Sequence, residues 1–222
     1  MKSDWDLTPD VSRRQRLGFD ETVFCGGKSP DQINRLLQMA LEAEESMLLT
    51  RLDSGKFSKL SAKLSEHLDY DAVSLTAILG EVAARKDNPR IAVVSGGTSD
   101  VRVARESVRT LHYYGVEVHE IYDVGVAGIW RLMDRIDELR EMSVVITVAG
   151  MEGTLPSVVA GMVPGVVIAV PVATGYGVAE NGTAALNSAL ASCAPGLVVV
   201  NVDNGYGAGC AALRMVNLMR RS

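Results

Sequence analysis

Short apolar runs alternate with helix-like segments from Arg90 to the end of the chain. The runs are rich in valine and isoleucine and lack regular polar alternation, which is typical of strands buried on both faces of a parallel sheet. The expected strands are 91–94, 116–122, 143–148, 165–170 and 196–202. The expected helices are 99–114, 128–140, 154–162, 182–193 and 208–221. This βαβ series predicts an α/β fold, a doubly wound parallel sheet sandwich.

The residues before Pro89 follow a different pattern. Ser29, Pro30 and Gln32 form a helix-start signature, and apolar residues then recur at helical spacing from Ile33. Further helices are expected over 56–68 and 71–85. All lysines of the chain lie before Pro89, and most glycines lie after it. We therefore predict a small, mainly helical domain at 1–88 and an α/β domain at 89–222.

Composition and charge argue against several classes of partner. The 222 residues carry a net charge of −5 and no basic run, so no nucleic-acid partner is expected. Glycines and prolines cut the apolar tract 142–179 into pieces shorter than the roughly 20 residues that a bilayer requires, so no membrane partner is expected. The acidic N-terminus lacks an apolar targeting segment, and the three cysteines lack paired spacing, which predicts a reducing, cytoplasmic location. Arg102, Arg105 and Arg109 are interpreted as a solvated or subunit-contacting helix face.

Small polar residues and glycines follow each of the five expected strands, where doubly wound sheets bind their ligands. The first strand leads into Ser95, Gly96, Gly97, Thr98, Ser99 and Asp100, a string suited to a phosphate or carboxylate group. The later strand ends add Gly150, Gly153, Thr174, Gly175, Asp203 and Asn204. The string does not read G-x-G-x-x-G, which disfavours a standard dinucleotide site. We predict one shared cleft in which these residues bind substrate.

Glu152 is the only charged residue between Glu141 and Glu180. It follows the third expected strand, between Gly150 and Gly153, with apolar strands beneath it. Desolvation should disfavour its ionised form there, which would suit it to proton transfer. The alternative is an ordinary helix-start glutamate that interacts with the helix dipole.

The cysteines and histidines leave alternatives open. Cys210 follows a glycine-rich segment near a helix start, where a thiol pKa is lowered, whereas Cys193 closes a helix. Residue chemistry alone thus favours Cys210 as a nucleophile, and a buried, inert thiol is the alternative for either. His67, His112 and His119 form no i, i+4 pair, so a histidine metal site is not expected.

Three segments resemble a known family: the string 95–100, AGMEGTLPSVVAG at 149–161, and GTAALNSALASCAPGLVVVNVDNGYGAG at 182–209. They are similar to the LarB family, the pyridinium-3,5-biscarboxylate mononucleotide synthases of nickel-pincer cofactor synthesis. They resemble more distantly PurE, the aminoimidazole ribonucleotide carboxylases and mutases. Near the N-terminus, residues 16–19 and 27–29 look like the LarB-type R-x-G-F and G-K-[ST] elements. PurE carries G-G-A-A-H-L-P, and Glu152 occupies approximately the slot of that histidine, which counts against purine chemistry.

The resemblance implies an activity and its residues. The LarB reaction carboxylates C5 of the pyridinium ring of nicotinic acid adenine dinucleotide with CO2 or bicarbonate, then cleaves the phosphoanhydride to release AMP. The reactive cysteine of the family's S-C-A-x-G segment matches Cys193, which overrides the preference for Cys210, and the family glutamate matches Glu152. Magnesium is implied, with Asp100 and Asp203 as candidate ligands, and no tightly bound organic cofactor is expected. A homo-oligomer, such as the octamers of PurE, is implied as well.

Two other hypotheses remain. The first is PurE-like carboxyl transfer on an aminoimidazole ribonucleotide. The second is a non-catalytic nucleotide-binding or regulatory protein that uses the same cleft.

Overall fold

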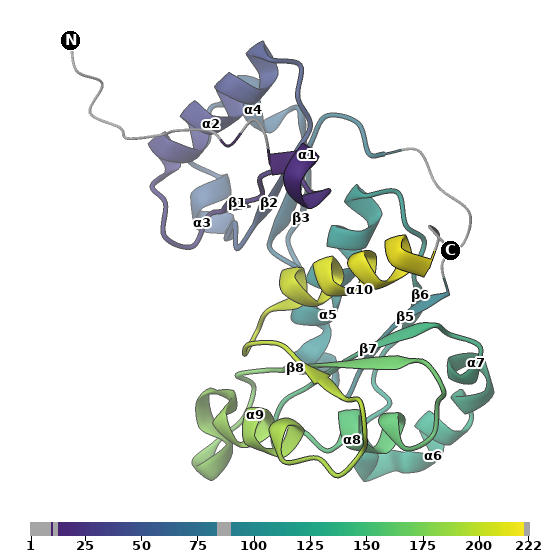
Figure 1. Cartoon of the computed structure of the whole chain (residues 1–222). Coiled ribbons are helices and arrows are strands. Elements are labelled where there is room, and N and C mark those ends of the chain that lie inside the picture. The colour runs from purple at the N-terminus through teal and green to yellow at the C-terminus, as the bar shows by residue number, and fades with distance from the viewer. Residues whose placement is uncertain (1–9, 11–12, 84–89, 220–222) are drawn as a thin grey trace. The chain divides into compact units, whose positions relative to one another are not determined.

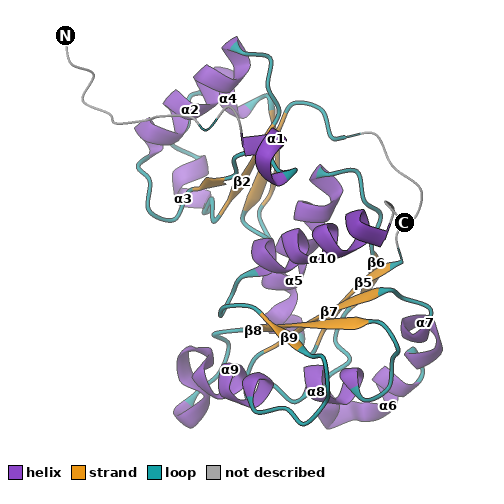
Figure 2. Ribbon diagram, in the orientation of Figure 1, coloured by secondary structure: helices purple, strands orange, loops and turns teal. Residues whose placement is uncertain are grey.

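The computed structural model describes residue 10, residues 13–83 and residues 90–219 of the chain (Figure 1). Backbone contacts divide the chain into two compact units, residues 1–70 with 76–81 and residues 71–75 with 82–222. The predicted boundary between 88 and 89 falls within 84–89, outside the described residues. Each unit contains its own sheet (Figure 2).

The second unit contains a five-stranded parallel sheet in the order β6-β5-β7-β8-β9. Its strands are β5 (Ile91–Ser95), β6 (His119–Ile121), β7 (Val144–Ala149), β8 (Val166–Pro171) and β9 (Val198–Val199). Its α-helices are α5 (Val101–Tyr113), α6 (Ile129–Met133), α7 (Ile136–Arg140), α8 (Leu155–Ala160), α9 (Thr183–Leu190) and α10 (Gly205–Met219). Three 3-10 helices are η1 (Thr98–Asp100), η2 (Val126–Gly128) and η3 (Gly177–Gly182). This strand order confirms the predicted flavodoxin-like, doubly wound fold.

The sheet lies between two layers of helices. Helices α5 and α10 cover one face, and α6, α7, α8 and α9 cover the other (Figure 1). Strand β7 is buried along its whole length, as the uninterrupted apolar run predicts. The predicted helix 128–140 is two short helices separated by Asp134 and Arg135, and β9 is much shorter than the predicted strand 196–202.

The first unit contains a four-stranded sheet in the order β1-β2-β4-β3. Its elements are α1 (Arg13–Leu17), β1 (Val23–Phe24), α2 (Pro30–Glu42), β2 (Met47–Thr50), α3 (Ser54–Phe57), α4 (Ala62–Ser65), β3 (Leu68–Asp71) and β4 (Thr76–Leu79). Strand β1 runs parallel to β2, and β4 runs antiparallel to it. Helix α2 begins with the predicted capping box, in which Ser29 and Gln32 satisfy each other's backbone N–H groups.

Two of the helices predicted for the first domain differ from the structure. The stretch predicted as one helix over 56–68 holds the end of α3 and the four-residue helix α4, with a turn between them. The stretch 71–85 contains strand β4, whose four residues are all buried and pair with β2. Full burial removes the polar alternation that would have marked β4 as a strand, so its apolar run fits a helical period equally well.

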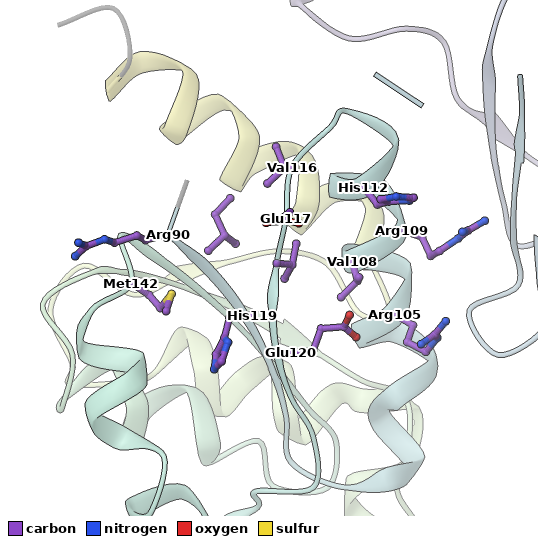
Figure 3. A pocket seen from close by; sticks show the side chains of 12 residues that line it. Arg90, Arg105, Val108, Arg109, His112, Val116, Glu117, His119, Glu120 and Met142 are labelled. Atoms are coloured by element: carbon purple, nitrogen blue, oxygen red, sulfur yellow. The ribbon is translucent and has the colours of Figure 1, made fainter. Parts of the chain in front are cut away.

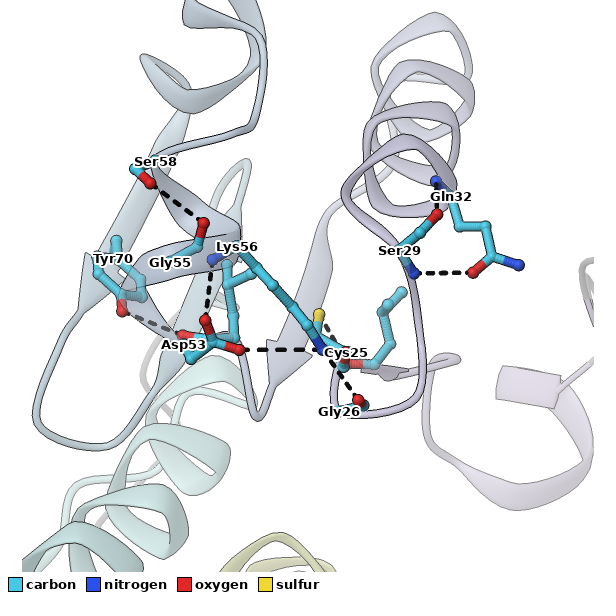
Figure 4. A network of polar contacts seen from close by, with 11 residues as sticks. Cys25, Gly26, Ser29, Gln32, Asp53, Gly55, Lys56, Ser58 and Tyr70 are labelled. Atoms are coloured by element: carbon cyan, nitrogen blue, oxygen red, sulfur yellow. Dashed lines mark hydrogen bonds and ion pairs between the residues drawn. The ribbon is translucent and has the colours of Figure 1, made fainter.

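Lys56 fastens the loop that precedes α2. Its Nζ donates to the backbone carbonyls of Cys25 and Gly26, at 2.7 and 2.9 Å, and lies 3.9 Å from Asp53 (Figure 4). Cys25 beneath it is fully buried, and burial raises the pKa of its thiol to about 12. Cys25 is therefore protonated and unreactive at neutral pH.

Asp71 ends β3 and accepts hydrogen bonds from three residues. Its Oδ1 accepts the N–H groups of Val73 and Ser74, at 2.9 and 3.3 Å, and its Oδ2 accepts from Arg105 Nε of α5 at 2.9 Å. Burial works to raise the pKa of Asp71, but the hydrogen bonds from Arg105, Val73 and Ser74 together lower it below its ordinary 3.8. A lowered folded pKa means that the ionised carboxylate stabilises the fold above the ordinary pKa, and that this contribution disappears as pH falls through the folded pKa.

Asp71→Asn should therefore destabilise the protein near neutral pH by about 1–2 kcal/mol, because hydrogen bonds to a charged acceptor are lost. The deficit should shrink as the pH is lowered below 3.8. Urea unfolding of both proteins at neutral and acidic pH measures it. Asp137→Asn is the control, since Asp137 is 90% exposed in its pair with Arg140, and should cost less than about 0.5 kcal/mol. A deficit that grew in acid would contradict this role of Asp71.

Within the described ranges, no helix is long and apolar enough to cross a membrane.

Candidate active site

The predicted substrate-binding residues lie around the switch point of the sheet. Strands β5 and β7 are neighbours, but the chain leaves β5 toward α5 on one face and leaves β7 toward α8 on the other. A crevice forms beyond the carboxyl ends of two such strands. The residues after β5 and β7 are 95–100 and 150–153, which are the two strings that sequence reasoning selected.

Asp100 connects these two strand ends. Its side chain accepts the N–H of Gly97 at 2.9 Å and also accepts the backbone N–H of Gly150. Asp100 is only 6% exposed, and this burial raises its pKa, with the nearby charge of Asp203 acting in the same direction. The Asp100 carboxyl group thus joins the loop after β5 to the loop after β7.

Asp203 connects the other two strand ends. It follows β9 with a left-handed backbone (φ 56°), and its Oδ1 accepts the N–H of Ala173, just after β8, at 3.0 Å. Its Oδ2 pairs with Arg102 of α5 at 3.0 Å. The structure therefore brings Asp100, Asp203, Gly150 and the residues after β8 together, as predicted.

Arg102 is a site residue that sequence reasoning missed. It was assigned to a solvated or subunit-contacting face with Arg105 and Arg109, but Arg102 pairs with Asp203 and Arg105 pairs with Asp71. Its position in the first turn after the first strand of the sheet was the available signal, because that turn faces the switch point.

Close backbone packing explains why glycine occupies positions 150 and 153. A Cβ on Gly150 would lie 2.3 Å from the carbonyl oxygen of Thr174, and one on Gly153 would lie 2.6 Å from Cα of Ala185 in α9. The N–H of Met151 also donates to the Thr174 carbonyl at 2.9 Å. These contacts fix the loop that carries Glu152.

Glu152 is exposed, so the predicted desolvation of its carboxylate is wrong for this chain. The apolar neighbours that suggested burial lie in β7 and α8, while the loop itself projects from the sheet with Met151 and Gly153 at φ 53° and 65°. Among the described residues, no hydrogen bond or ion pair engages its side chain. The carboxylate is accordingly open to a ligand.

Cys193 is exposed, whereas Cys210 is half-buried within α10. Cys193 lies in the turn between α9 and β9. The side chain of its neighbour Ser192 is hydrogen-bonded to Ser157 of α8, at 2.8 Å between the two Oγ atoms. Helix α8 begins three residues after Glu152, so the Cys193 turn and the Glu152 loop meet at the same helix.

The remaining predicted ligands divide into two groups. Ser95 is buried and its Oγ accepts the N–H of Asp123 at 3.2 Å, and Asn204 Oδ1 accepts the N–H of Gly207 at 2.8 Å. These two side chains hydrogen-bond to backbone N–H groups of the protein itself. Thr98 and Ser99 are exposed. Gly96, Gly97, Thr174 and Gly175 are half-buried at the same strand ends.

The candidate magnesium ligands are engaged within the protein. Asp203 uses both carboxylate oxygens on Arg102 and Ala173, and Asp100 accepts two backbone N–H groups. Over the part of the chain that the structure describes, no group of three or more acidic, histidine or cysteine side chains could hold a metal ion. The residues as placed do not fit the ion.

A cavity of about 590 Å³ lies elsewhere, at the amino ends of β5 and β6. Its lining includes Arg90, Arg105, Arg109, His112 and His119 (Figure 3). The cavity thus lies at the opposite end of these strands from the candidate site.

Comparison with known proteins agrees with this geometry. Residues 90–222 match the AIR carboxylase family, and residues 6–81 match the LarB/PurE-like N-terminal domain. An uncharacterized protein of Methanocaldococcus jannaschii is 37% identical over 97% of this chain and 86% of its own length. The N5-carboxyaminoimidazole ribonucleotide mutase of the same organism is 34% identical over 58% of this chain and 79% of its own.

The fold agrees as well. The crystal structure of Treponema denticola PurE superposes with a TM-score of 0.50 at 23% identity, covering 59% of this chain and 82% of that one. Such a likeness shows the fold of the second unit, and the family match over 90–222 covers the same residues. The chain therefore belongs to the AIR carboxylase family, with a LarB/PurE-like N-terminal domain in front of the shared α/β fold.

Proposed function

We propose that the protein is a carboxylase of the LarB type, acting on nicotinic acid adenine dinucleotide. It would add CO2 to C5 of the pyridinium ring and then hydrolyse the phosphoanhydride to AMP and pyridinium-3,5-biscarboxylate mononucleotide. The match of residues 6–81 to a LarB/PurE-like N-terminal domain supports this choice within the AIR carboxylase family.

The observation that carries the proposal is an exposed thiol and an exposed carboxylate at one helix. Cys193 and Glu152 are both open to solvent, and their segments meet at α8. The chain's histidines lie elsewhere, His67 in the first unit, His112 on α5 and His119 on β6. Proton transfer at the loop after β7 is therefore assigned to the Glu152 carboxylate, and the exposed Cys193 thiol is the proposed nucleophile.

The chemistry needs both groups. An electron-poor pyridinium cannot attack CO2 until a nucleophile adds to it, and a thiolate is the side chain best suited to add reversibly. Addition of the Cys193 thiolate at C4 gives a dihydropyridine whose C5 is the nucleophilic carbon of an enamine. C5 then attacks CO2, forming the new carbon–carbon bond and leaving an iminium at C6.

Glu152 completes the substitution. It removes the proton from C5, which restores the enamine, and loss of the thiolate from C4 then restores the aromatic ring. No net oxidation occurs, because CO2 replaces a proton on C5. Thr98 and Ser99, whose hydroxyl groups are exposed after β5, are proposed to bind the substrate's phosphate or carboxylate groups.

Incubation of the purified protein with nicotinic acid adenine dinucleotide and bicarbonate tests the proposal. We expect AMP and a pyridinium product heavier by one CO2, detected by mass spectrometry. Glu152→Gln should lower the carboxylation rate by about 10²–10⁴-fold, because an amide cannot accept the C5 proton. Glu180→Gln, an exposed acidic residue in η3, is the matched control and should leave the rate unchanged. If the folded wild-type protein yields neither product, the proposal is wrong.

The second candidate is AIR-type carboxyl transfer, which the similarity to the N5-carboxyaminoimidazole ribonucleotide mutase favours. That chemistry uses no ring–thiol adduct. Conversion of N5-carboxyaminoimidazole ribonucleotide by the wild-type protein, retained in Cys193→Ser, would select it over the pyridinium reaction.

We also propose that the protein forms the predicted homo-oligomer. Tyr176 and Val178, near the strand ends, and Leu190 on α9 are apolar side chains that are 78%, 99% and 66% exposed. Apolar exposure of this kind fits a contact between subunits.

A further inference from the structure

Ser192 closes a turn around Cys193. Its Oγ accepts the N–H of Ala194 at 3.2 Å, so one side-chain hydrogen bond spans the cysteine from the residue before it to the residue after it. The same oxygen accepts the hydroxyl of Ser157 at 2.8 Å. The backbone of Cys193 is thereby fixed locally and tied to α8 through one atom.

Helix α8, which makes this contact, is packed into the core of the second unit. Leu155 and Val159 are buried in the core between the sheet and the helices on that face, and Pro156 occupies the first turn. Ser157 lies between them on the half-buried side of the helix. The same core includes Leu197, which packs against it just before β9. The segment that carries Cys193 is therefore held by the Ser157–Ser192 hydrogen bond on one side of the turn and by the packing of Leu197 against the core on the other.

Contacts of their own side chains do not fix the positions of Cys193 and Glu152. Within the described residues, neither one makes a hydrogen bond or an ion pair. The backbone that carries each side chain therefore determines its placement. For Glu152 this is the 150–153 loop that leads into α8, and for Cys193 it is the turn closed by Ser192. The Ser157–Ser192 hydrogen bond joins these two backbones, in addition to the packing of Gly153 against Ala185 of α9.

The proposed reaction makes this junction important. The thiolate must reach C4 while the carboxylate reaches the proton on C5, and these are adjacent atoms of one ring. Displacement of a reacting group by about 1 Å can lower a rate on the order of a hundredfold. We propose that Ser157 and Ser192 are positioning residues, which hold the Cys193 thiol at a fixed separation from Glu152. This inference rests on the proposed pyridinium carboxylation.

The test uses Ser157→Ala, Ser192→Ala and the double variant in the full-length protein. Each single variant should lower kcat for carboxylation by about tenfold to a hundredfold while KM for the dinucleotide changes little, since substrate binding does not use these hydroxyls. The double variant should lose no more than the worse single variant, because both remove the same interaction. Ser157→Thr and Ser192→Thr keep the hydroxyl and should restore most of the rate.

Two measurements separate positioning from folding and from thiol activation. Thermal unfolding should change little, and the iodoacetamide reaction of Cys193, followed in a Cys210→Ser background, should stay close to wild type. Cys25 is buried and does not interfere. Ser188→Ala is the matched control, since Ser188 is a half-buried serine of α9 without a hydrogen bond among the described residues, and it should carboxylate normally.

The outcomes distinguish the two levels of inference. An active wild-type protein whose serine-to-alanine variants are equally active overturns the positioning role alone. Losses that multiply in the double variant, or slow iodoacetamide reaction that accounts for the lost rate, overturn it too. An inactive wild-type protein overturns the proposed function and, with it, this inference.

Discussion

Cys193→Ser should abolish carboxylation of nicotinic acid adenine dinucleotide, with a loss on the order of a thousandfold or more. A serine hydroxyl is protonated at neutral pH and is a poor nucleophile without an adjacent base, whereas cysteine supplies some thiolate. Without the thiolate adduct, C5 of the pyridinium has no electron pair to offer CO2. The measurement is the rate of product formation by mass spectrometry at saturating bicarbonate.

Cys210→Ser is the matched control for this prediction. Cys210 lies within α10 on the side of the sheet covered by α5, whereas Cys193 lies in an exposed turn tied to α8. The control should carboxylate at close to the wild-type rate. The opposite pattern, an active Cys193→Ser and an inactive Cys210→Ser, would move the nucleophile to α10 and remove the role assigned to Glu152.

The fold of the second unit could be predicted because its local and global signals agree. The apolar runs at 91–94 and 143–148 lack polar alternation, which is typical of strands buried on both faces, and β5 and β7 are buried throughout. Handedness and connection rules then leave few ways to order such strands. The glycine-rich strand ends placed the site, because ligands of this architecture bind at the switch point.

The strands of the first unit could not be predicted from the same signals. The turn between β3 and β4 contains no glycine or proline, and it is formed by the Asp71 side chain and by Leu75 at φ 56°. Sequence patterns detect such a turn poorly, because aspartate is also common at helix starts. The four consecutive buried residues of β4 form a short run that periodicity alone does not distinguish from a buried helical segment.

Side-chain partners in the site also escaped the sequence. Arg102 and Asp203 are 101 residues apart, and Ser157 and Ser192 are 35 apart. Nothing local marks either pair, since each contact exists only because the parallel sheet brings distant loops to one edge. The exposure of Glu152 was missed for a related reason, because apolar neighbours in sequence are buried beneath the loop rather than around it.

Gly150→Ala should damage both the fold and the site. A Cβ there would lie 2.3 Å from the carbonyl oxygen and 3.0 Å from Cβ of Thr174, so backbone atoms rather than a flexible side chain must move. Overpacking of this kind costs about 1–3 kcal/mol. The N–H of Gly150 is also one of the donors to Asp100, so the displacement would separate the loops after β5 and β7.

The expected result is a lower unfolding midpoint in urea together with loss of dinucleotide binding by calorimetry. Gly161→Ala, at the end of α8, is the matched control, because its Cβ would meet no atom closer than 3.6 Å and its φ is −79°. That control should bind normally and lose no stability. Normal binding by a destabilised Gly150→Ala would show that the loop after β7 does not contact the dinucleotide. The carboxylate of Glu152, which the same loop carries, would then have no access to the ring, and the assignment of the strand-end cleft would fail with it.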